Sequence, residues 1–312
     1  MPGFITTVAL NPAVDRTILV PGFMAGATNR VLSSRMDPGG KGINVARVAK
    51  ALGASVQVVG FIGEGNGSPI VESLKQESIP AEFVTASGEN RVNLKIIDPD
   101  TGGLTELNDN GFTVEEQHLR QFMTSFERAL NATRVLVLAG SLPAGVPAAI
   151  YHDLVVMAKR AGVATIVDAD GAAALEALKA GPTLIKPNQA EAERLLGSSL
   201  ESDADIVHAA SVLHARGPGM VAISHGARGA ALVAPEGRWW ATPPAIRAGS
   251  TVGAGDSMVA GFAVGLLGTL EPEKAFRLAI AAGAATASLE GTQLCTRDQV
   301  LALAPAVRVQ VR

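Results

Sequence analysis

The chain has 312 residues and a formal net charge of −3, and it is 47% hydrophobic but only 4% aromatic. This charge argues against general nucleic-acid binding, which needs a basic face, and no apolar run reaches the roughly 18–20 residues of a membrane span. A single cysteine, Cys295, rules out an intrachain disulfide, and no basic segment precedes an apolar core near residue 1, so we expect a cytoplasmic protein.

The first third of the chain alternates short apolar runs with glycine-rich turns. Four of these runs do not alternate with predicted helices, so we predict that they form a separate small β-sheet. This sheet, made of about 12–37 and 89–112, would act as a lid that covers the site. Its open edges and apolar surface favour pairing with the lid of a second subunit in a homodimer. The predicted strands are 4–10, 16–20, 29–35, 55–61, 81–84, 91–97 and 104–107, and the predicted helices are 45–53 and 70–78.

After Thr113 strands and helices alternate regularly. This spacing predicts one α/β domain spanning 1–312, with a mostly parallel sheet and helices on both faces. Ligands bind beyond the carboxyl ends of the strands in such sheets. The residues that follow strand ends, and should therefore share one rim, are Asp15, Ser141, Asp168, Lys186 and Ser224. The predicted helices are 114–130, 148–161, 172–180, 190–196, 204–216, 258–267, 272–289 and 297–303, and the predicted strands are 134–138, 164–168, 183–185, 220–223, 230–234 and 238–241.

The segment Gly253-Ala254-Gly255-Asp256 precedes an apolar run that suits a helix. Small residues let backbone N–H groups point one way at the mouth of a helix, whose dipole favours negative charge, so the sequence predicts an anion hole. A carboxylate beside a bound phosphate is electrostatically unfavourable, so we expect Asp256 to have a role in the reaction. The obvious role is to accept a proton from an attacking hydroxyl. Taken alone, the motif also fits a glycine turn in which Asp256 caps the helix.

A second glycine-rich loop, residues 37–44, runs into the helix predicted at 45–53. That helix is amphipathic and stops at a glycine, and Lys41 and Asn44 lie at its mouth. The loop alone also fits a glycine turn with a solvated lysine.

Five motifs follow one another in a single order: 39–44 (GGKGIN), 140–143 (GSLP), 186–191 (KPNQAE), 224–229 (SHGARG) and 252–256 (VGAGD). In this the chain resembles the ribokinase-like (PfkB) carbohydrate kinases over essentially its whole length. Residues 10–15, Lys41 and 91–93 are most similar to the branch that phosphorylates sugar phosphates, and the N-terminal half resembles the kinases of fructose 1-phosphate. Residues 291–296 are more similar to the minor kinases of fructose 6-phosphate, which usually have glycine at the position of Lys41. Tagatose-6-phosphate kinases belong to the same branch, so the sugar stays open.

The resemblance implies how ATP and Mg²⁺ are used. Asp256 would take the proton of the sugar hydroxyl, and the N–H groups of Gly253, Ala254 and Gly255 would hold the charge on the transferring phosphoryl group. Asn188 and Glu191 would position Mg²⁺ through water. The residues implied for the nucleotide are Lys186, Asn188, Ser224, His225, Gly226, Ala227, Arg228 and Gly229, and His225 replaces the apolar residue that is usual in the family.

The resemblance also implies a phosphosugar site. Asp15 and Asn44 would bind hydroxyl groups, and Lys41, Arg91 and Arg30 would bind the phosphate already on the sugar, which arginine can meet with two hydrogen bonds. Arg30 also fits a solvated edge charge. The full substrate set is Asp15, Arg30, Gly39, Gly40, Lys41, Asn44, Arg91 and Ser141, whereas Asp168 is expected to be structural. Many relatives use a monovalent cation such as K⁺, for which carbonyls near Ser250 and Val252 and in 287–293 could supply oxygens.

Two other classes of function bear comparison with the sequence. The same fold could serve a regulator that binds sugar phosphate or nucleotide without catalysis, although Asp256, Lys186, Asn188 and Glu191 are all present. A dinucleotide-binding oxidoreductase is excluded, because no G-x-G-x-x-G follows the first strand with an acidic residue about 20 positions later.

Overall fold

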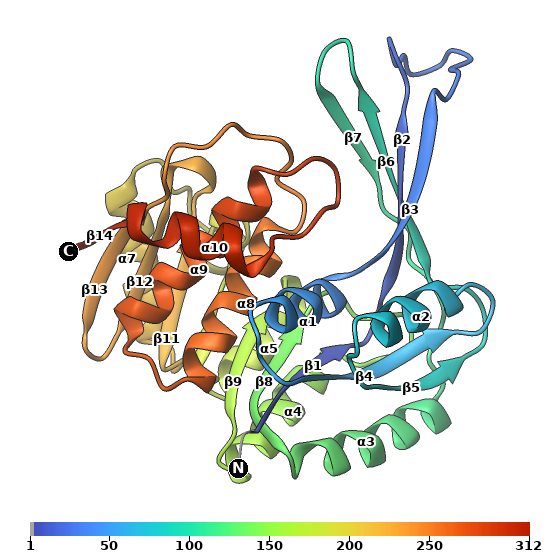
Figure 1. Ribbon diagram of the computed structural model, residues 1–312. Helices are drawn as coiled ribbons and strands as arrows, with labels where there is room; N and C mark the ends of the chain where they lie inside the picture. Colours follow the sequence, from blue (N-terminus) through green and yellow to red (C-terminus); the bar gives the residue numbers. More distant parts are fainter. Residues whose placement is uncertain (1–2) are drawn as a thin grey trace.

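The computed structural model describes residues 3–312, and its centre is a sheet of ten strands in the order β14-β13-β12-β11-β10-β9-β8-β1-β4-β5 (Figure 1). From β5 to β11 all neighbours pair in parallel, and from β11 to β14 they pair antiparallel. The strands are β1 (Phe4–Ala9), β4 (Val56–Gly63), β5 (Ala81–Ala86), β8 (Thr133–Ala139), β9 (Ala164–Asp168), β10 (Leu184–Ile185), β11 (Met220–Ser224), β12 (Ala230–Ala234), β13 (Gly237–Thr242) and β14 (Arg308–Val311).

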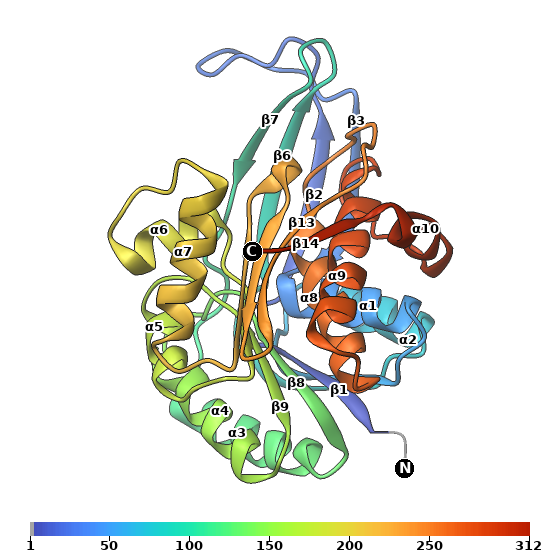
Figure 2. The same ribbon diagram turned by 90° about the vertical axis from the view of Figure 1, so that its left-hand side faces the viewer.

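Helices cover both faces of this sheet, so the expected α/β architecture is confirmed (Figure 2). Helices α1 (Lys41–Ala51), α2 (Ser68–Gln76), α8 (Ala254–Leu267), α9 (Pro272–Ala287) and α10 (Arg297–Leu303) pack on one face. Helices α3 (Glu116–Leu130), α4 (Ile150–Arg160), α5 (Gly171–Lys179), α6 (Gln189–Leu196) and α7 (Asp203–His214) pack on the other. Because both faces are covered, strands such as β8 and β9 read as continuous apolar runs.

The strand order reverses at β1, since the chain passes from β1 to β4 and β5 on one side and then returns to β8 on the other. The carboxyl ends of the strands at such a reversal form a crevice in which ligands bind. Helices α1 and α8 both begin at this edge (Figure 1), and β9 ends at it with Asp168. The fold therefore delivers both glycine-rich loops to one place.

A separate four-stranded sheet projects beyond this edge, which confirms the predicted small sheet (Figure 1). Its order is β3-β2-β6-β7, and it consists of β2 (Ala13–Leu19), β3 (Ser33–Gly39), β6 (Arg91–Asp98) and β7 (Gly103–Leu107). Arg35 and Asp37 of β3 both hydrogen-bond the hydroxyl of Thr292, in the loop after α9, at 2.9 and 2.6 Å. The base of the lid is thus tied to the segment beside the start of α8.

Several predicted boundaries differ from the structure, and helices α1 and α8 each begin four residues earlier than expected, at Lys41 and Ala254. β3 begins at Ser33 and runs through Pro38 to Gly39, whereas a strand was expected at 29–35. β2 starts at Ala13, three residues before the expected strand, and β14 was not predicted at all. Proline is tolerated in β3 because that strand lies at an edge of its sheet.

Candidate active site

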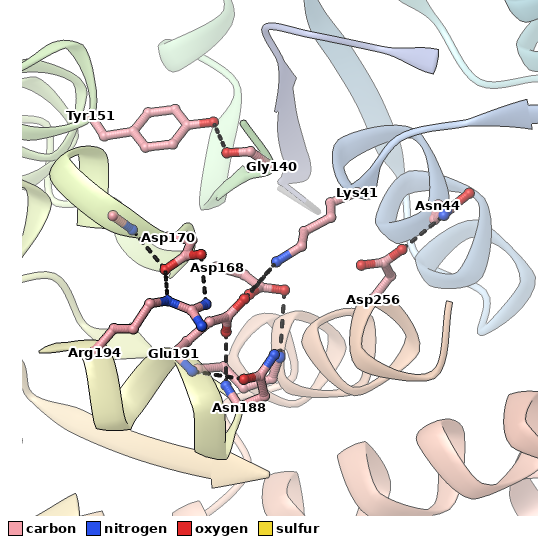
Figure 3. Close-up of polar contacts among 12 residues, drawn as sticks. Lys41, Asn44, Gly140, Tyr151, Asp168, Asp170, Asn188, Glu191, Arg194 and Asp256 are labelled. Atoms are coloured by element: carbon pink, nitrogen blue, oxygen red, sulfur yellow. Dashed lines mark hydrogen bonds and ion pairs between the residues drawn. The ribbon is translucent and has the colours of Figure 1, made fainter. Parts of the chain in front are cut away.

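The two glycine-rich loops meet through a hydrogen bond between the helices that they open. Asn44, in the first turn of α1, donates from Nδ2 to Oδ2 of Asp256, in the first turn of α8, at 2.8 Å (Figure 3). Gly253 precedes α8 with a φ of 75°, and a Cβ there would lie 2.9 Å from Leu294 Cδ2. A side chain at Gly253 would therefore be strained twice, by its backbone angle and by the contact.

Lys186 extends to the same helix mouth. A Cβ at Gly255 would lie 3.5 Å from Lys186 Nζ, so this ammonium group stands beside the free N–H groups of the first turn of α8. The helix dipole and the ammonium group both favour an anion at this point. The structure thus joins the predicted anion hole to a residue that was assigned to the nucleotide phosphates.

The pKa of Asp256 is raised to about 6, first by burial and then by the negative charge of Asp168. Lys41, Lys186 and the hydrogen bond from Asn44 oppose this rise. A carboxyl group with a pKa near 6 is largely ionised at pH 7 and is a better proton acceptor than an ordinary aspartate. The site therefore holds a buried carboxylate with a raised pKa at the start of α8, as the predicted roles of base and anion hole would require.

Asp168, at the end of β9, organises the positive charge of the site. Its carboxylate is 1% exposed and pairs with Lys41 at 3.1 Å and with Lys186 at 3.5 Å. Burial opposes ionisation, but Lys186 and Lys41 outweigh it and lower the pKa of Asp168. Sequence reasoning expected a structural carboxylate here, and the structure shows one that places two ammonium groups.

The ammonium group of Lys41 contacts one of the residues predicted for Mg²⁺. Its ammonium group is 3.5 Å from Oε1 of Glu191 in addition to its contact with Asp168 (Figure 3). Burial disfavours the charge of Lys41, but Asp168, Glu191 and Asp256 together raise its pKa, so it stays protonated. Its assignment to the sugar's own phosphate stays a prediction, and its contacts favour the phosphoryl-transfer side.

Asn188 and Glu191 form a capping box at the start of α6. Asn188 Oδ1 accepts from the Glu191 N–H at 2.9 Å, and Glu191 Oε2 accepts from the Asn188 N–H at 2.8 Å. Only Oε1 of the buried Glu191 then remains to face the site. Within 3–312 no group of three or more His, Cys, Asp or Glu side chains could hold a metal ion by itself. This donor set fits Mg²⁺ that keeps most of its waters and also binds substrate phosphates, as Mg²⁺ prefers.

On the lid side, Asp15 is held by two neighbours on β6. Asn93 donates to its Oδ1 at 3.0 Å, and Lys95 pairs with its Oδ2 at 2.9 Å. A Cβ at Gly39 would lie 2.5 Å from Asp15 Oδ2, so glycine is needed there to make room for this carboxylate. Asp15 thus has a fixed position at the base of the lid.

Asn11, which follows β1, links Arg91 to Ser141 by hydrogen bonds. Arg91 donates from Nε to the Asn11 carbonyl at 3.1 Å, and Asn11 Nδ2 donates to the Ser141 hydroxyl at 3.3 Å. Behind them, the buried Tyr151 donates its hydroxyl to the Gly140 carbonyl at 3.2 Å (Figure 3). The loop after β8 is therefore fixed from two sides.

The loop after β11, residues 224–229, lies beside the Mg²⁺ candidates. Ser224 forms a β-bridge with Asn188, and residues 226–228 form one turn of 3₁₀ helix. Arg228 pairs with Asp203 at 2.8 Å, and Nδ1 of His225 lies 3.8 Å from the same carboxylate. These contacts shape the loop from outside, and the roles of its residues toward the nucleotide stay predictions.

Arg30 lies apart from the other residues predicted to bind the sugar. It is exposed in the loop between β2 and β3, and the register Leu19↔Ser33 places this loop beyond the outer end of the lid (Figure 1).

The sequence does not single out Lys95 or Tyr151, and it includes Asn11 and Asn93 only within the segments 10–15 and 91–93. Period-two alternation would have placed Arg91, Asn93 and Lys95 on one face of β6. For Tyr151, on helix α4, the sequence carries no comparable signal.

Comparisons with known proteins agree with this geometry. Residues 8–299 match the profile described as pfkB family carbohydrate kinase, and the chain belongs to that family. It is 36% identical to 1-phosphofructokinase of Escherichia coli (strain K12), over 98% of each chain. It is similar to crystal structures of phosphofructokinase-2 from E. coli in complex with substrates and products (TM-score 0.91, 32% identity) and in complex with potassium (TM-score 0.90, 31% identity), each covering 97% of this chain and 99% of the other. The fold is thus ribokinase-like, and no helix within 3–312 is long and apolar enough to cross a membrane.

Proposed function

We propose that the protein transfers the γ-phosphoryl group of ATP to a ketohexose monophosphate, converting fructose 1-phosphate to fructose 1,6-bisphosphate. Membership of the family makes the chain a phosphotransferase that acts on a sugar hydroxyl, and kinases generally use ATP with Mg²⁺. The observation that carries the proposal is the buried Asp256, with a pKa near 6, at the mouth of α8 between Asn44 and Lys186. A lid standing over this edge, with Asp15 and Arg91 at its base, supplies a place for the sugar.

Asp256 acts first as an acceptor for the proton of the free sugar hydroxyl. The hydroxyl oxygen then bonds to the γ-phosphorus, the bond from that phosphorus to the oxygen bridging to the β-phosphate breaks, and ADP leaves with the electron pair. Because phosphoryl transfer needs mainly alignment and charge stabilisation, the protein's main task is to hold the groups in line. Asn44 orients Asp256 for this task through the 2.8 Å bond.

The charge on the transferring group meets the N–H groups at the start of α8 together with Lys186 and Lys41. Asp168 holds both ammonium groups in place, one on each carboxylate oxygen, so they need not reorganise during the reaction. Bound Mg²⁺ would be held near Asn188 and Glu191 and would neutralise phosphate charge. For K⁺ we propose the carbonyls near Ser250 and Val252 and in 287–293, two segments joined by the bond from Gly249 N–H to the Ala287 carbonyl at 2.9 Å.

The experiment that tests this function is ADP formation with three sugars. We expect kcat/KM to be highest with fructose 1-phosphate and lower with fructose 6-phosphate and tagatose 6-phosphate. A different order of kcat/KM values would change the assignment of the preferred sugar but not that of the kinase reaction. ATP binding without ADP formation from any ketohexose monophosphate would instead indicate a non-catalytic regulator.

The pH dependence follows from the raised pKa of Asp256. Because the base must be deprotonated, kcat/KM is expected to rise as the pH increases through about 6. Initial rates across this range measure the rise. A phosphate group can titrate near pH 6 as well, so the same rise should be sought with free fructose as a slow substrate. A profile that is flat with fructose would contradict the assignment of the base.

We further propose that the chain acts as a single domain and dimerises through its lid. More than half of the large apolar side chains that are exposed within 3–312 lie on the lid, a concentration that marks an interaction surface. Sedimentation at micromolar concentration is expected to show a dimer of the 31.9 kDa chain. Replacing Leu32 and Leu107 by serine should weaken it, whereas the same change at Leu175 and Leu301, exposed but outside the lid, should not. A wild-type protein that sediments only as a monomer would contradict the proposal. The exposed lid residues are Met24, Val31, Leu32, Met36, Leu104 and Leu107.

A further inference from the structure

The inner face of the lid carries a buried ion pair that the proposed reaction leaves without a role. Lys95 is 6% exposed and Asp15 is 5% exposed, and their charged atoms are 2.9 Å apart. Burying two charges costs more than a surface pair does, and such a pair adds little stability by itself. A buried pair in a small projecting sheet therefore calls for a further reason.

Two buried polar atoms beside this pair lack partners among the described residues. Thr17 lies opposite Lys95 in the register of β2 and β6, and Asn93 lies opposite Asp15. Neither Oγ1 of Thr17 nor Oδ1 of Asn93 has a hydrogen-bond partner, although both atoms are buried. Buried polar atoms are normally satisfied. Two such atoms on either side of one ion pair indicate that a polar ligand completes the face.

The remaining hydrogen-bonding capacity matches a sugar ring. Asp15 uses one lone pair of each oxygen for Asn93 and Lys95 and can accept from further hydroxyl groups. Lys95 has three N–H donors and gives one to Asp15, so two remain. A ring hydroxyl that donates to Asp15 and accepts from Lys95 would use both groups at once, and such paired bonds strengthen each other.

We propose that Lys95 is a specificity-determining residue, which donates to a ring hydroxyl of the sugar bound by Asp15 and so distinguishes ketose monophosphates by the configuration of that hydroxyl. This inference rests on the proposed function. An epimer with the hydroxyl inverted would leave the ammonium group and Asp15 unsatisfied, and sites built to hydrogen-bond a hydroxyl reject such analogues strongly.

The test compares fructose 1-phosphate with its C3 and C4 epimers, psicose 1-phosphate and tagatose 1-phosphate. For Lys95→Met we expect KM for fructose 1-phosphate to rise about 10–100-fold, the scale of one charge-assisted hydrogen bond. KM for ATP should stay unchanged. The preference for fructose 1-phosphate over at least one epimer should shrink roughly tenfold or more. Lys95→Arg should restore part of both effects, because it keeps the charge and the donors.

Arg16→Met is the matched control. Arg16 is the residue next to Asp15 on β2, so its side chain lies on the opposite, exposed face of the lid, where it bonds Ser34. This variant should leave the sugar kinetics and the epimer preference unchanged.

Lys95→Gln, which keeps a donor but not the charge, replaces Lys95→Met if the latter fails to fold. An equal loss of kcat/KM for all three sugars, with the epimer preference intact, would overturn the proposal and make the pair purely structural. A wild-type protein that phosphorylates none of the three sugars or fructose 6-phosphate would overturn the proposed function and this inference together. Activity in the wild type with an unchanged preference in the variant would overturn the inference alone.

Discussion

Replacing Asp256 by asparagine is expected to lower kcat by about 10²–10⁴-fold, the usual contribution of a general base. The amide keeps the shape of the carboxylate and an oxygen that can accept from Asn44, so the contact between α1 and α8 is retained. Asparagine carries no charge, and burial raises the pKa of Asp256 in the wild type, so the variant should fold at least as stably. The loss should therefore appear in kcat, with KM for ATP little changed.

Asp298→Asn is the control for this experiment, because Asp298 also lies in the first turn of a helix, α10, but is exposed and is not one of the predicted site residues. It should behave as the wild type does. If well-folded Asp256→Asn keeps more than about a tenth of the wild-type kcat, Asp256 is not the base and its high pKa needs another explanation.

Much of the fold could be predicted because its strands are buried on both faces. The residues of β9 form a short apolar run between turns, and the predicted strand coincides with the observed one. The four residues of β14 give no such signal, since Arg308 and Gln310 alternate with two valines on a strand that pairs only with β13. Pro38 and Gly39 likewise indicate a loop, and only the edge position of β3 allows a strand there.

The sequence predicts which loops form the site, but not which side chains contact one another in it. Glycine-rich segments and the carboxylate Asp256 are visible in sequence, because they have local backbone requirements. The position of the Lys41 ammonium group depends instead on how α1, β9 and α6 pack together, and no short stretch of sequence encodes that distance. For the same reason the sequence predicts only a structural role for Asp168, although its carboxylate holds two lysines.

Comparing Lys41→Met with Arg91→Ala on two sugars should show which of the two side chains binds the phosphate already on the sugar. Lys41 contacts Asp168 and Glu191, on the side of the transferring phosphoryl group, so its removal should lower kcat by about 10²–10³-fold with fructose 1-phosphate and with free fructose alike. Asp168 keeps Lys186 as a partner, which limits the cost to folding. Arg91 lies on the lid near Ser141, so its removal should raise KM for fructose 1-phosphate about 10–100-fold.

Free fructose makes this comparison decisive, because it lacks the phosphate that Arg91 would bind and should lose little in Arg91→Ala. Lys50→Met, at the other end of α1, removes the same charge outside the site and should leave both sugars unaffected. If Lys41→Met instead raises KM for fructose 1-phosphate and spares fructose, Lys41 binds the sugar's own phosphate, as the sequence predicts. Its contacts with Asp168 and Glu191 would then have to open when the sugar binds, since one ammonium group cannot keep both carboxylates and a distant phosphate within 3.5 Å.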